Sequence, residues 1–403
     1  MFRLFDVPIY KGHEKLIEIF LKGGEPTGIP YLEKTSIIRQ FPEAFRTKKM
    51  SNALERKSVE YASTSGSSGE RLTLIRASGW WDREYEDAYS SNSELKGFDF
   101  ASDRKAILAT VFCSGGSCGI ADTSVEMRLS GRTLYLNAKQ NPHDWTEIDI
   151  QRIAAELNEF KPKVLQVNPS YLTIFIDKLV RFQVELPYIP ETIVSAYEFL
   201  TSYCRTRIET FFGRKLLDMF GSSELGVLFM QDAAGSYNRC PHASIVELSP
   251  VYPKGRIYEL VITSWKNPLM PFLRYRTGDL IETLEVPQAG GVVRASEQMA
   301  IARPHGRWAD AQIFSDDQRY ITPYTFDKLI SECAWQPKFY RLEKRGDRIV
   351  FLYVETEPHS SGCSPDENFQ FLNQLFCDKQ VILQKVEILQ PEQSGKFFTF
   401  RSA

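Results

Sequence analysis

The segment best suited to chemistry is a run of small polar residues between Tyr61 and Arg71. From Ser63 to Arg71 it holds four serines, one threonine and two glycines. Hydroxyls, exposed backbone N–H groups and glycines that tolerate positive φ together form an anion cradle. The spacing differs from a kinase-type P-loop, because no lysine follows the second glycine. We predict a phosphate site here, with a flexible Ser/Gly linker as the alternative; its residues are Thr64, Ser65, Gly66, Ser67, Ser68 and Gly69.

A second segment, Asp218 to Leu225, combines a strand, an aromatic residue, a tight turn and a carboxylate. Ligands bind at such strand ends in α/β sheets. Phe220 could stack on a purine, and Glu224 could hold Mg²⁺ against phosphate oxygens. The alternative is that Gly-Ser-Ser-Glu forms the capping box of a following helix. The nucleotide-binding prediction covers Met219, Phe220, Gly221, Ser222 and Ser223.

A third segment, Pro271 to Leu280, ends in Thr-Gly-Asp. A carboxylate fixed on a turn can accept hydrogen bonds from both ribose hydroxyls, which makes Asp279 a candidate nucleotide ligand. The alternative is the charged tip of a β-hairpin.

Taken in order, these segments resemble the motifs of acyl-adenylate-forming enzymes. The family's phosphate loop reads Thr-Ser-Gly-Ser/Thr-Thr-Gly, its strand-end motif Tyr-Gly-x-Thr-Glu, and its third motif Arg-Tyr-x-Thr-Gly-Asp. Ser68, Phe220 and Ser223 depart from these patterns, and Glu70-Arg71 replaces the usual Lys-Pro. The Leu-Arg-Tyr-Arg-Thr-Gly-Asp form is most similar to the phenylacetate–coenzyme A ligase branch.

Three further segments are assigned through this resemblance. The family's hinge, Gly-Arg-x-Asp-Asp, matches the stretch around Arg307, which would hold the ribose or the α-phosphate; Ala309 departs from it. The terminal Gly-Lys matches Lys396, which would enter the site during adenylation. Ser195, Ala196 and Tyr197 match the segment that lies against adenine.

The pattern of the chain predicts the elements that position these residues. Strands and helices alternate between residues 106 and 220, which favours an α/β fold with a parallel sheet. β-hairpins are expected after residue 250, and a compact α+β unit after about 308. We therefore expect a large multi-layer α/β domain with a β-rich subdomain (1–306) and a small, mobile α+β domain (307–403). The expected elements are helices at 13–22, 150–160, 201–212 and 365–376, and strands at 106–113, 163–167, 192–195, 216–220, 257–263, 280–285, 340–342, 348–354 and 381–389.

Composition limits the function classes. The 403 residues carry a net charge of −2, so neither nucleic acid nor an anionic membrane is indicated as a partner. Seven scattered cysteines without CxxC spacing favour reduced thiols, and no signal peptide or apolar span is visible. We expect a cytoplasmic protein that acts on a small molecule, and a homodimer is left open.

Two other motifs in the sequence allow a different function. Gly115 to Gly119 fits Gly-x-Ser-x-Gly, so Ser117 could be a hydrolase nucleophile, with His242, His305 and His359 downstream. In the adenylating interpretation this turn lines the acyl pocket instead, with Phe112, Gly115, Gly116, Tyr171 and Gly221. Cys240 and His242 could contribute two ligands to a zinc ion.

The resemblance implies ATP-dependent activation of a carboxylic acid, an aromatic one by branch similarity. Mg²⁺ and ATP are the expected cofactors, with Glu224 and Lys396 as catalytic residues. Coenzyme A, a carrier-protein thiol and an amine remain open as acyl acceptors. Adenylylation of a phenolic deazaflavin cofactor is a further alternative. Retention of all the charged motif residues argues against a protein that only binds ligand.

Overall fold

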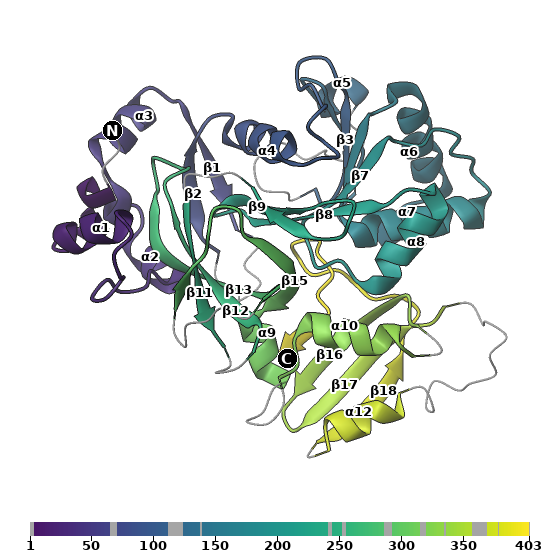
Figure 1. The fold of residues 1–403 in the computed structure, drawn as a ribbon. Helices are drawn as coiled ribbons and strands as arrows, with labels where there is room; N and C mark the ends of the chain where they lie inside the picture. Colours follow the sequence, from purple (N-terminus) through teal and green to yellow (C-terminus); the bar gives the residue numbers. More distant parts are fainter. Residues whose placement is uncertain are drawn as a thin grey trace. The chain divides into compact units, whose positions relative to one another are not determined.

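The computed structural model describes residues 4–64, 71–111, 124–137, 139–240, 244–251, 255–285, 292–314, 320–333, 336–356, 369–377 and 379–402. The chain folds into two compact units. Unit 1 consists of Met1–Lys96 and Phe220–Pro304, and unit 2 of Gly97–Met219 and His305–Ala403. Figure 1 shows the elements, and each unit is described by itself.

Unit 1 begins with short helices and a hairpin, followed by the long helix α4. After the chain returns from unit 2, an antiparallel sheet forms with the order β14-β11-β12-β13-β15-β10-β9. The helices of unit 1 are α1 (Glu14–Leu21), α2 (Lys34–Gln40), α3 (Lys48–Glu55) and α4 (Trp80–Ser91), with short 3-10 helices at Leu4–Asp6, Pro8–Tyr10 and Glu43–Phe45. Its strands are β1 (Val59–Ser63), β2 (Thr73–Ala77), β9 (Gly226–Gln231), β10 (Tyr237–Arg239), β11 (Ser244–Pro250), β12 (Ile257–Ser264), β13 (Phe272–Thr283), β14 (Val293–Arg294) and most of β15 (Ala300–Arg307).

One apolar core holds unit 1 together. Residues from the N-terminal helices, such as Phe20 and Phe45, pack with sheet residues such as Leu260 and Phe272. Phe45 and Phe272 meet edge to face, with ring centroids 5.8 Å apart. The N-terminal residues 4–58 therefore belong to the same core as the β-rich part of the chain.

Unit 2 contains the parallel sheet that the alternating pattern predicts. Strands β8 (Leu216–Ser222), β7 (Thr192–Ser195), β6 (Val164–Val167), β3 (Lys105–Leu108) and β5 (Thr133–Tyr135) run parallel, and β4 (Leu129–Ser130) pairs antiparallel at the edge. The main helices are α6 (Glu147–Phe160), α7 (Pro169–Phe182) and α8 (Ser202–Phe212); short helices lie at Val125–Arg128 (α5) and Pro142–Asp144.

The starts and ends of these helices follow from side-chain caps. Thr146 and Asp149 form a reciprocal capping box at the start of α6. The Asn168 side chain accepts from the backbone N–H groups of Ser170 and Tyr171, and Pro169 occupies the first turn of α7. Thr201 caps α8, which ends at Gly213 with φ 61°.

The rest of unit 2, the small module (His305–Ala403), carries a second sheet. Its order is β18-β17-β16-β19, with β16 and β17 antiparallel and the outer pairs parallel. Figure 1 shows α10 and α12 beside this sheet. The elements are α9 (Trp308–Phe314), α10 (Pro323–Ser331), β16 (Phe339–Arg345), β17 (Arg348–Val354), α12 (Gln370–Leu375), β18 (Gln380–Lys385) and β19 (Phe400–Ser402).

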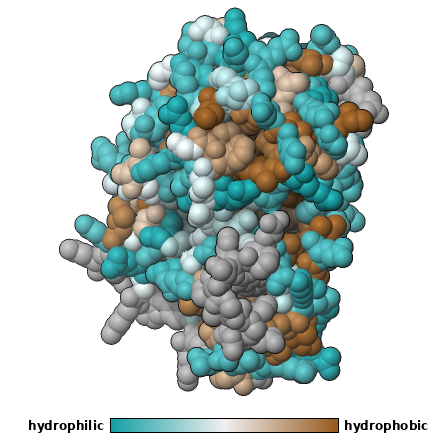
Figure 2. All heavy atoms as spheres, turned by 90° about the vertical axis from the view of Figure 1, so that its right-hand side faces the viewer, coloured by the Kyte–Doolittle hydropathy of each residue, from teal (hydrophilic) through white to brown (hydrophobic). Residues whose placement is uncertain are grey.

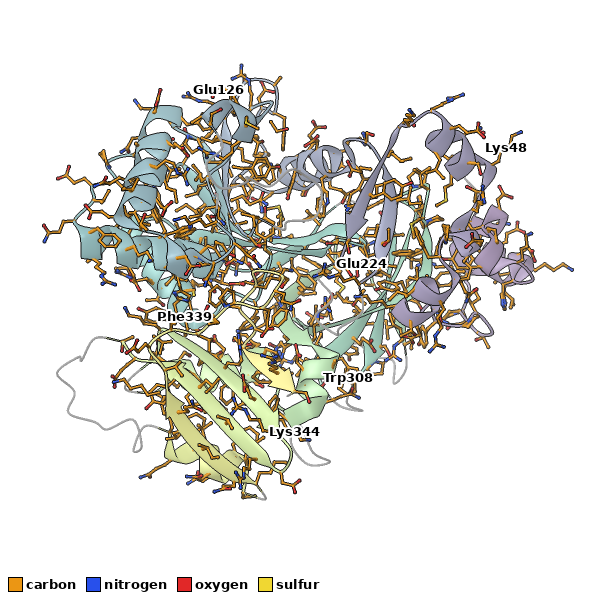
Figure 3. All side chains as sticks on the ribbon, turned by 180° about the vertical axis from the view of Figure 1, so that it is seen from behind. Lys48, Glu126, Glu224, Trp308, Phe339 and Lys344 are labelled. Atoms are coloured by element: carbon orange, nitrogen blue, oxygen red, sulfur yellow. The ribbon has the colours of Figure 1, made fainter. Side chains whose placement is uncertain are left out.

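The small module packs against the parallel-sheet part of its own unit. Phe339, at the start of β16, shares a core with helices α6 to α8 (Figure 3). Ser202, at the start of α8, donates through its backbone N–H (2.9 Å) and its hydroxyl (2.6 Å) to Asp327 on α10. Lys338 pairs with Asp177 on α7 at 3.2 Å. Apolar and polar contacts therefore both join the two parts of unit 2.

The fold class expected from the sequence is confirmed. The predicted helices at 13–22, 150–160 and 201–212 correspond to α1, α6 and α8, and the predicted strands of the parallel sheet correspond to β6, β7 and β8. Strand β3 ends at Leu108, earlier than the expected residue 113, because its neighbour β6 ends at Val167, the partner of Leu108. The predicted helix 365–376 is described only as α12. The division into domains 1–306 and 307–403 remains a proposal.

The surface of unit 2 also carries apolar side chains. Ile148 on α6 and Val180 on α7 are exposed, and Figure 2 shows apolar groups gathered in the upper half of the face it presents. Among the helices of the described residues, we find none with the length and apolar character needed to cross a membrane.

Candidate active site

The carboxyl ends of three parallel strands in unit 2 lie in register with one another and with Asp218 in the middle of β8. Leu108 of β3 pairs with Val167 of β6, Val167 with Ser195 of β7, and Ser195 with Asp218 of β8. The residues that follow these positions therefore emerge side by side at one edge of the sheet, here called the carboxyl edge. Ligands bind at this edge in open α/β sheets.

Polar residues occupy the carboxyl edge. Thr110 and Ser195 are buried, and the hydroxyl of Ser195 has no hydrogen-bond partner among the residues that the structure describes. Tyr197 has φ 81°, a rare conformation for a residue other than glycine, and Gln166 donates to its hydroxyl at 2.6 Å. An orphaned buried hydroxyl and a constrained tyrosine beside it are features of a ligand site rather than of a packed strand end.

The predicted catalytic lysine lies on a segment of the small module that reaches this edge. Thr110 donates through its hydroxyl to the carbonyl oxygen of Ser394 at 2.9 Å. The N–H of Phe397 donates to Glu198 at 2.8 Å. Lys396 is thus flanked on both sides by contacts to the carboxyl edge, and its charge acts on Glu198. In Figure 1 the same segment, in yellow, rises from the small sheet.

Gly395 fits this position because there is no room for a side chain. A Cβ atom there would lie 2.1 Å from the Thr110 hydroxyl oxygen and 2.8 Å from that of Tyr171, and its φ is 78°. Tyr171 is fully buried and donates to the carbonyl oxygen of Gln140 at 2.8 Å. The structure therefore brings Lys396 and Tyr171 together with the segment Ser195, Ala196 and Tyr197.

Glu198 is the ionisable group at the centre of these contacts. Its carboxylate also accepts from the N–H of Ser170, at the start of α7, at 3.3 Å. Burial raises the pKa of Glu198, and the hydrogen bonds and the positive charge of Lys396 oppose that shift.

The expected hinge lies where β15 meets α9. Gly306 has φ 91°, and a Cβ there would lie 2.5 Å from Cγ of Pro323. His305 is buried, with Nδ1 3.0 Å from the Thr322 hydroxyl oxygen. Arg307 is half-buried at the end of β15, and Trp308 (labelled in Figure 3) stacks on Tyr320.

In unit 1, the predicted phosphate loop connects β1 and β2. Thr64 is buried and accepts from the N–H of Leu72 through its hydroxyl at 3.0 Å, while its own N–H donates to the Leu72 carbonyl at 3.0 Å. These bonds join the two ends of the loop. The other predicted residues of this loop, 65–69, lie outside the described residues.

Glu224 lies in the turn between β8 and β9 (Figure 3). Two glycines make that turn tight: a Cβ on Gly221 would lie 2.2 Å from the Gly226 carbonyl oxygen, and one on Gly226 would collide with Glu84. The hydroxyl of Ser222 is buried and, within the described part of the chain, has no hydrogen-bond partner. The capping-box alternative is wrong, because strand β9 rather than a helix follows Glu224.

A buried arginine lies near this turn. Arg76 on β2 is 1% exposed, and its guanidinium lies 4.8 Å from the Trp80 ring centroid. It makes no hydrogen bond to any described residue. Burial lowers the pKa of Arg76, and the negative charges of Glu60, Glu224 and Glu84, in that order, oppose the shift. Glu224 therefore lies in the field of a fixed positive charge.

Asp279 lies on a bulge rather than on a turn, which corrects the expectation from sequence. The ladder between β12 and β13 shifts register between the pairs Glu259–Leu280 and Val261–Arg276, and Gly278 has φ 72° there. The N–H of Asp279 donates to the Thr277 hydroxyl at 2.9 Å. The hairpin-tip alternative is wrong for the same reason, because β13 continues to Thr283.

Packing also constrains the aromatic residue before this turn. Phe220 lies 6.2 Å from Phe229, centroid to centroid, and is half-buried. Ser223 and Met219 are likewise half-buried. Stacking of Phe220 on a purine therefore stays a prediction.

Several predicted residues lie outside the described residues: Phe112, Gly115, Gly116, Ser117 and His242. Cys240 is buried, and its burial raises the pKa of the thiol to about 12. The described residues contain no group of three or more His, Cys, Asp or Glu side chains placed to hold a metal ion. The zinc and hydrolase alternatives therefore gain no support from the described part of the chain.

Sequence reasoning missed two residues of the candidate site, Thr110 and Arg76. Thr110 could have been found, because it is a polar residue directly after a buried strand. The burial of Arg76 could not be predicted from the sequence, since a charged residue in an alternating strand is usually expected to face solvent.

The chain resembles known proteins both in fold and in sequence. No family model matches the chain. The structure superimposes on a crystal structure of 2-hydroxyisobutyryl-CoA ligase in the postadenylation state with a TM-score of 0.65 and 15% identity, covering 99% of this chain and 86% of that one. The fold is thus that of adenylate-forming CoA ligases.

Two known proteins are similar to parts of the chain in sequence. The chain is 30% identical over 264 residues to a phenylacetate–coenzyme A ligase of Aromatoleum evansii, covering 61% of this chain and 57% of the relative. It is 29% identical over 131 residues to protein CapK of Staphylococcus aureus, covering 32% and 28%. These matches span less than two thirds of each relative. The chain thus shares its fold with 2-hydroxyisobutyryl-CoA ligase and part of its sequence with phenylacetate–coenzyme A ligases.

Proposed function

We propose that the protein activates a carboxylic acid with ATP, giving acyl-AMP and pyrophosphate, and passes the acyl group to coenzyme A. The observation that supports this most is the pair of hydrogen bonds that attach the segment around Lys396 to the carboxyl edge, from Thr110 to Ser394 and from Phe397 to Glu198. A lysine at this edge can neutralise charge where a carboxylate and an α-phosphate meet.

The chemistry requires one bond exchange at phosphorus. A carboxylate oxygen of the acid attacks the α-phosphorus, and the bond from that phosphorus to the pyrophosphate oxygen breaks. Protein groups need only position the reactants and offset charge, because no covalent enzyme intermediate is required. Lys396 would carry the positive charge, and the hydroxyls of the loop after Thr64 would hold the departing phosphates.

The residues of the β8–β9 turn fit a magnesium ion. Mg²⁺ keeps several waters and takes one or two protein carboxylates together with substrate phosphates. Glu224 supplies a carboxylate, and the orphaned hydroxyl of Ser222 adds a second oxygen close by in the sequence. When bound, the ion would offset the negative charge of the triphosphate.

We propose residues in each unit that would bind parts of the nucleotide. In unit 2, Ser195, Ala196 and Tyr197 would lie against adenine, and Arg307 would contact ribose or α-phosphate. In unit 1, Asp279 would accept from the ribose hydroxyls; its side chain is 8% exposed, so it would act in a partly dry site. Similarity to phenylacetate–coenzyme A ligases favours an aromatic acid.

Release of pyrophosphate tests this function. The purified protein is incubated with Mg·ATP and a panel of aryl and alkyl acids, with and without coenzyme A. We expect acid-dependent pyrophosphate release, stimulated by coenzyme A if it is the acceptor. Substitution of an amine or a carrier-protein thiol for coenzyme A identifies other acceptors. Absence of release with every acid would reject the proposal.

A further inference from the structure

The carboxylate of Glu198 joins three segments of unit 2. Glu198 follows strand β7 directly after Tyr197, whose φ is 81°. One oxygen accepts from the N–H of Ser170, at the positive end of helix α7, at 3.3 Å. The other accepts from the N–H of Phe397, beside the predicted catalytic lysine, at 2.8 Å. One side chain therefore ties the lysine segment to the sheet and to a helix terminus.

The other contacts of the lysine segment do not replace this one. Thr110 bonds the carbonyl oxygen of Ser394, which lies before the lysine, and Gly395 packs on Thr110 and Tyr171. On the far side of Lys396, Glu198 accepts from the N–H of Phe397 at 2.8 Å, and Arg341 of the small module donates to the carbonyl oxygen of Phe398 at 3.1 Å. Of these two bonds, the one to Glu198 ties the segment to the parallel-sheet part of the unit. The ring of Phe397 also packs against Tyr171, with centroids 6.2 Å apart, so the bond to Glu198 adds the polar, directional part of this attachment and orients the backbone next to Lys396.

Charge supports the same arrangement. A carboxylate at the N-terminus of a 14-residue helix is favoured by the helix dipole, and an N–H donor to a carboxylate forms a stronger bond than one to a neutral acceptor. The electrostatic interaction between Lys396 and Glu198 also favours the docked segment.

We propose that Glu198 is a positioning residue for Lys396 in the adenylation half-reaction. It acts through the N–H of Phe397 and does not contact the reacting atoms. This role rests on the proposed function. It predicts that Glu198 matters while acyl-AMP forms and is dispensable once the lysine segment has left the carboxyl edge for acyl transfer.

The test uses Glu198→Gln, which keeps the size of the side chain but removes the charge. The matched control is Asp177→Asn, because Asp177 also links the small module to the parallel-sheet part, through Lys338, but does not contact the lysine segment. Acyl-AMP formation and the conversion of chemically supplied acyl-AMP are measured separately. Loss of a hydrogen bond to a charged acceptor predicts acyl-AMP formation slower by about tenfold to a hundredfold in Glu198→Gln. Conversion of supplied acyl-AMP should be unchanged, and Asp177→Asn should change both steps less than threefold.

Trypsin cleavage after Lys396, followed by mass spectrometry on the folded full-length protein, provides a readout independent of activity. We expect faster cleavage there in Glu198→Gln than in the wild type or in Asp177→Asn. Normal acyl-AMP formation in Glu198→Gln, equal losses in both half-reactions, or equal effects of the two variants would overturn the inference. If the wild type forms acyl-AMP from no acid, the proposed function fails. The rate of trypsin cleavage after Lys396 then tests whether Glu198 holds the lysine segment. An unchanged cleavage rate in Glu198→Gln overturns the inference.

Discussion

The hydroxyl of Thr110 donates a hydrogen bond of 2.9 Å to the carbonyl oxygen of Ser394, 284 residues later in the chain. Thr110 follows strand β3 of the parallel sheet, and Ser394 lies two residues before the predicted catalytic lysine. This bond joins the carboxyl edge to the C-terminal segment of the small module. Its consequences for activity can be tested at Gly395, where the packing is tightest.

Gly395→Ala should displace the lysine segment. The new Cβ would lie 2.1 Å from the Thr110 hydroxyl oxygen, at a backbone φ of 78°. Strain of about 1–3 kcal/mol predicts acyl-AMP formation slower by about fivefold to 150-fold. Gly346→Ala is the matched control, since Gly346 also has positive φ (58°) but nothing lies within 4 Å of its Cβ position. Equal rates in the two variants would show that the tight contact at Gly395 has no role.

Lys396→Ala should separate the two half-reactions. A single well-aimed donor is worth about 3–4 kcal/mol, so acyl-AMP formation should fall by about a hundredfold to a thousandfold. Conversion of supplied acyl-AMP should continue, because the lysine segment is expected to leave the carboxyl edge for that step. Equal loss of both steps would indicate a structural role for Lys396. Full activity in both would reject the motif assignment.

Glu224→Gln should weaken the response to magnesium. The variant removes the carboxylate of the β8–β9 turn, so pyrophosphate release should require more Mg²⁺ and fall by about a hundredfold at saturation. Glu60→Gln is the control, because Glu60 also lies near Arg76, 4.0 Å away, but on strand β1. A titration of Mg²⁺ against initial rate distinguishes them. The same Mg²⁺ dependence in wild type and Glu224→Gln would exclude the metal role.

The thiol of Cys240 should be inert at neutral pH. Burial raises its pKa to about 12, so the reactive thiolate is scarce below that pH and increases as the pH rises toward it. Cys377 is exposed and provides the internal comparison. Alkylation with iodoacetamide at pH 8, read by peptide mass spectrometry, should modify Cys377 and spare Cys240. Labelling of Cys240 that appears only after a chelator is added would instead indicate a bound metal.

Much of the parallel sheet could be predicted from the sequence, because its elements carry local signals. Helix α8 begins at a capping threonine and ends at a glycine, and β6 and β7 are short apolar runs between polar turns. The carboxyl edge follows from this alternation, since parallel strands place their ends together. The assignment of Ser195 and Tyr197 to the nucleotide site rests on the family resemblance and stays a prediction.

Other features depend on long-range packing and gave no local signal. The bulge at Gly278 arises from the register of β12 against β13, which no pattern within β13 reveals. The contact between Glu198 and Phe397 joins residues 199 positions apart. Arg76 shows the same limit, because its burial depends on aromatic residues of helix α4 that pack over it.

Isotope transfer tests the central claim, attack of a carboxylate on the α-phosphorus, most directly. The wild-type protein is incubated with ATP, Mg²⁺, the acceptor and an acid from the panel whose carboxylate carries ¹⁸O, and the products are analysed by mass spectrometry. Formation and breakdown of acyl-AMP predict one ¹⁸O atom in each AMP and none in pyrophosphate. AMP without the label, or label in inorganic phosphate alongside ADP, would contradict adenylation and replace it with another use of ATP.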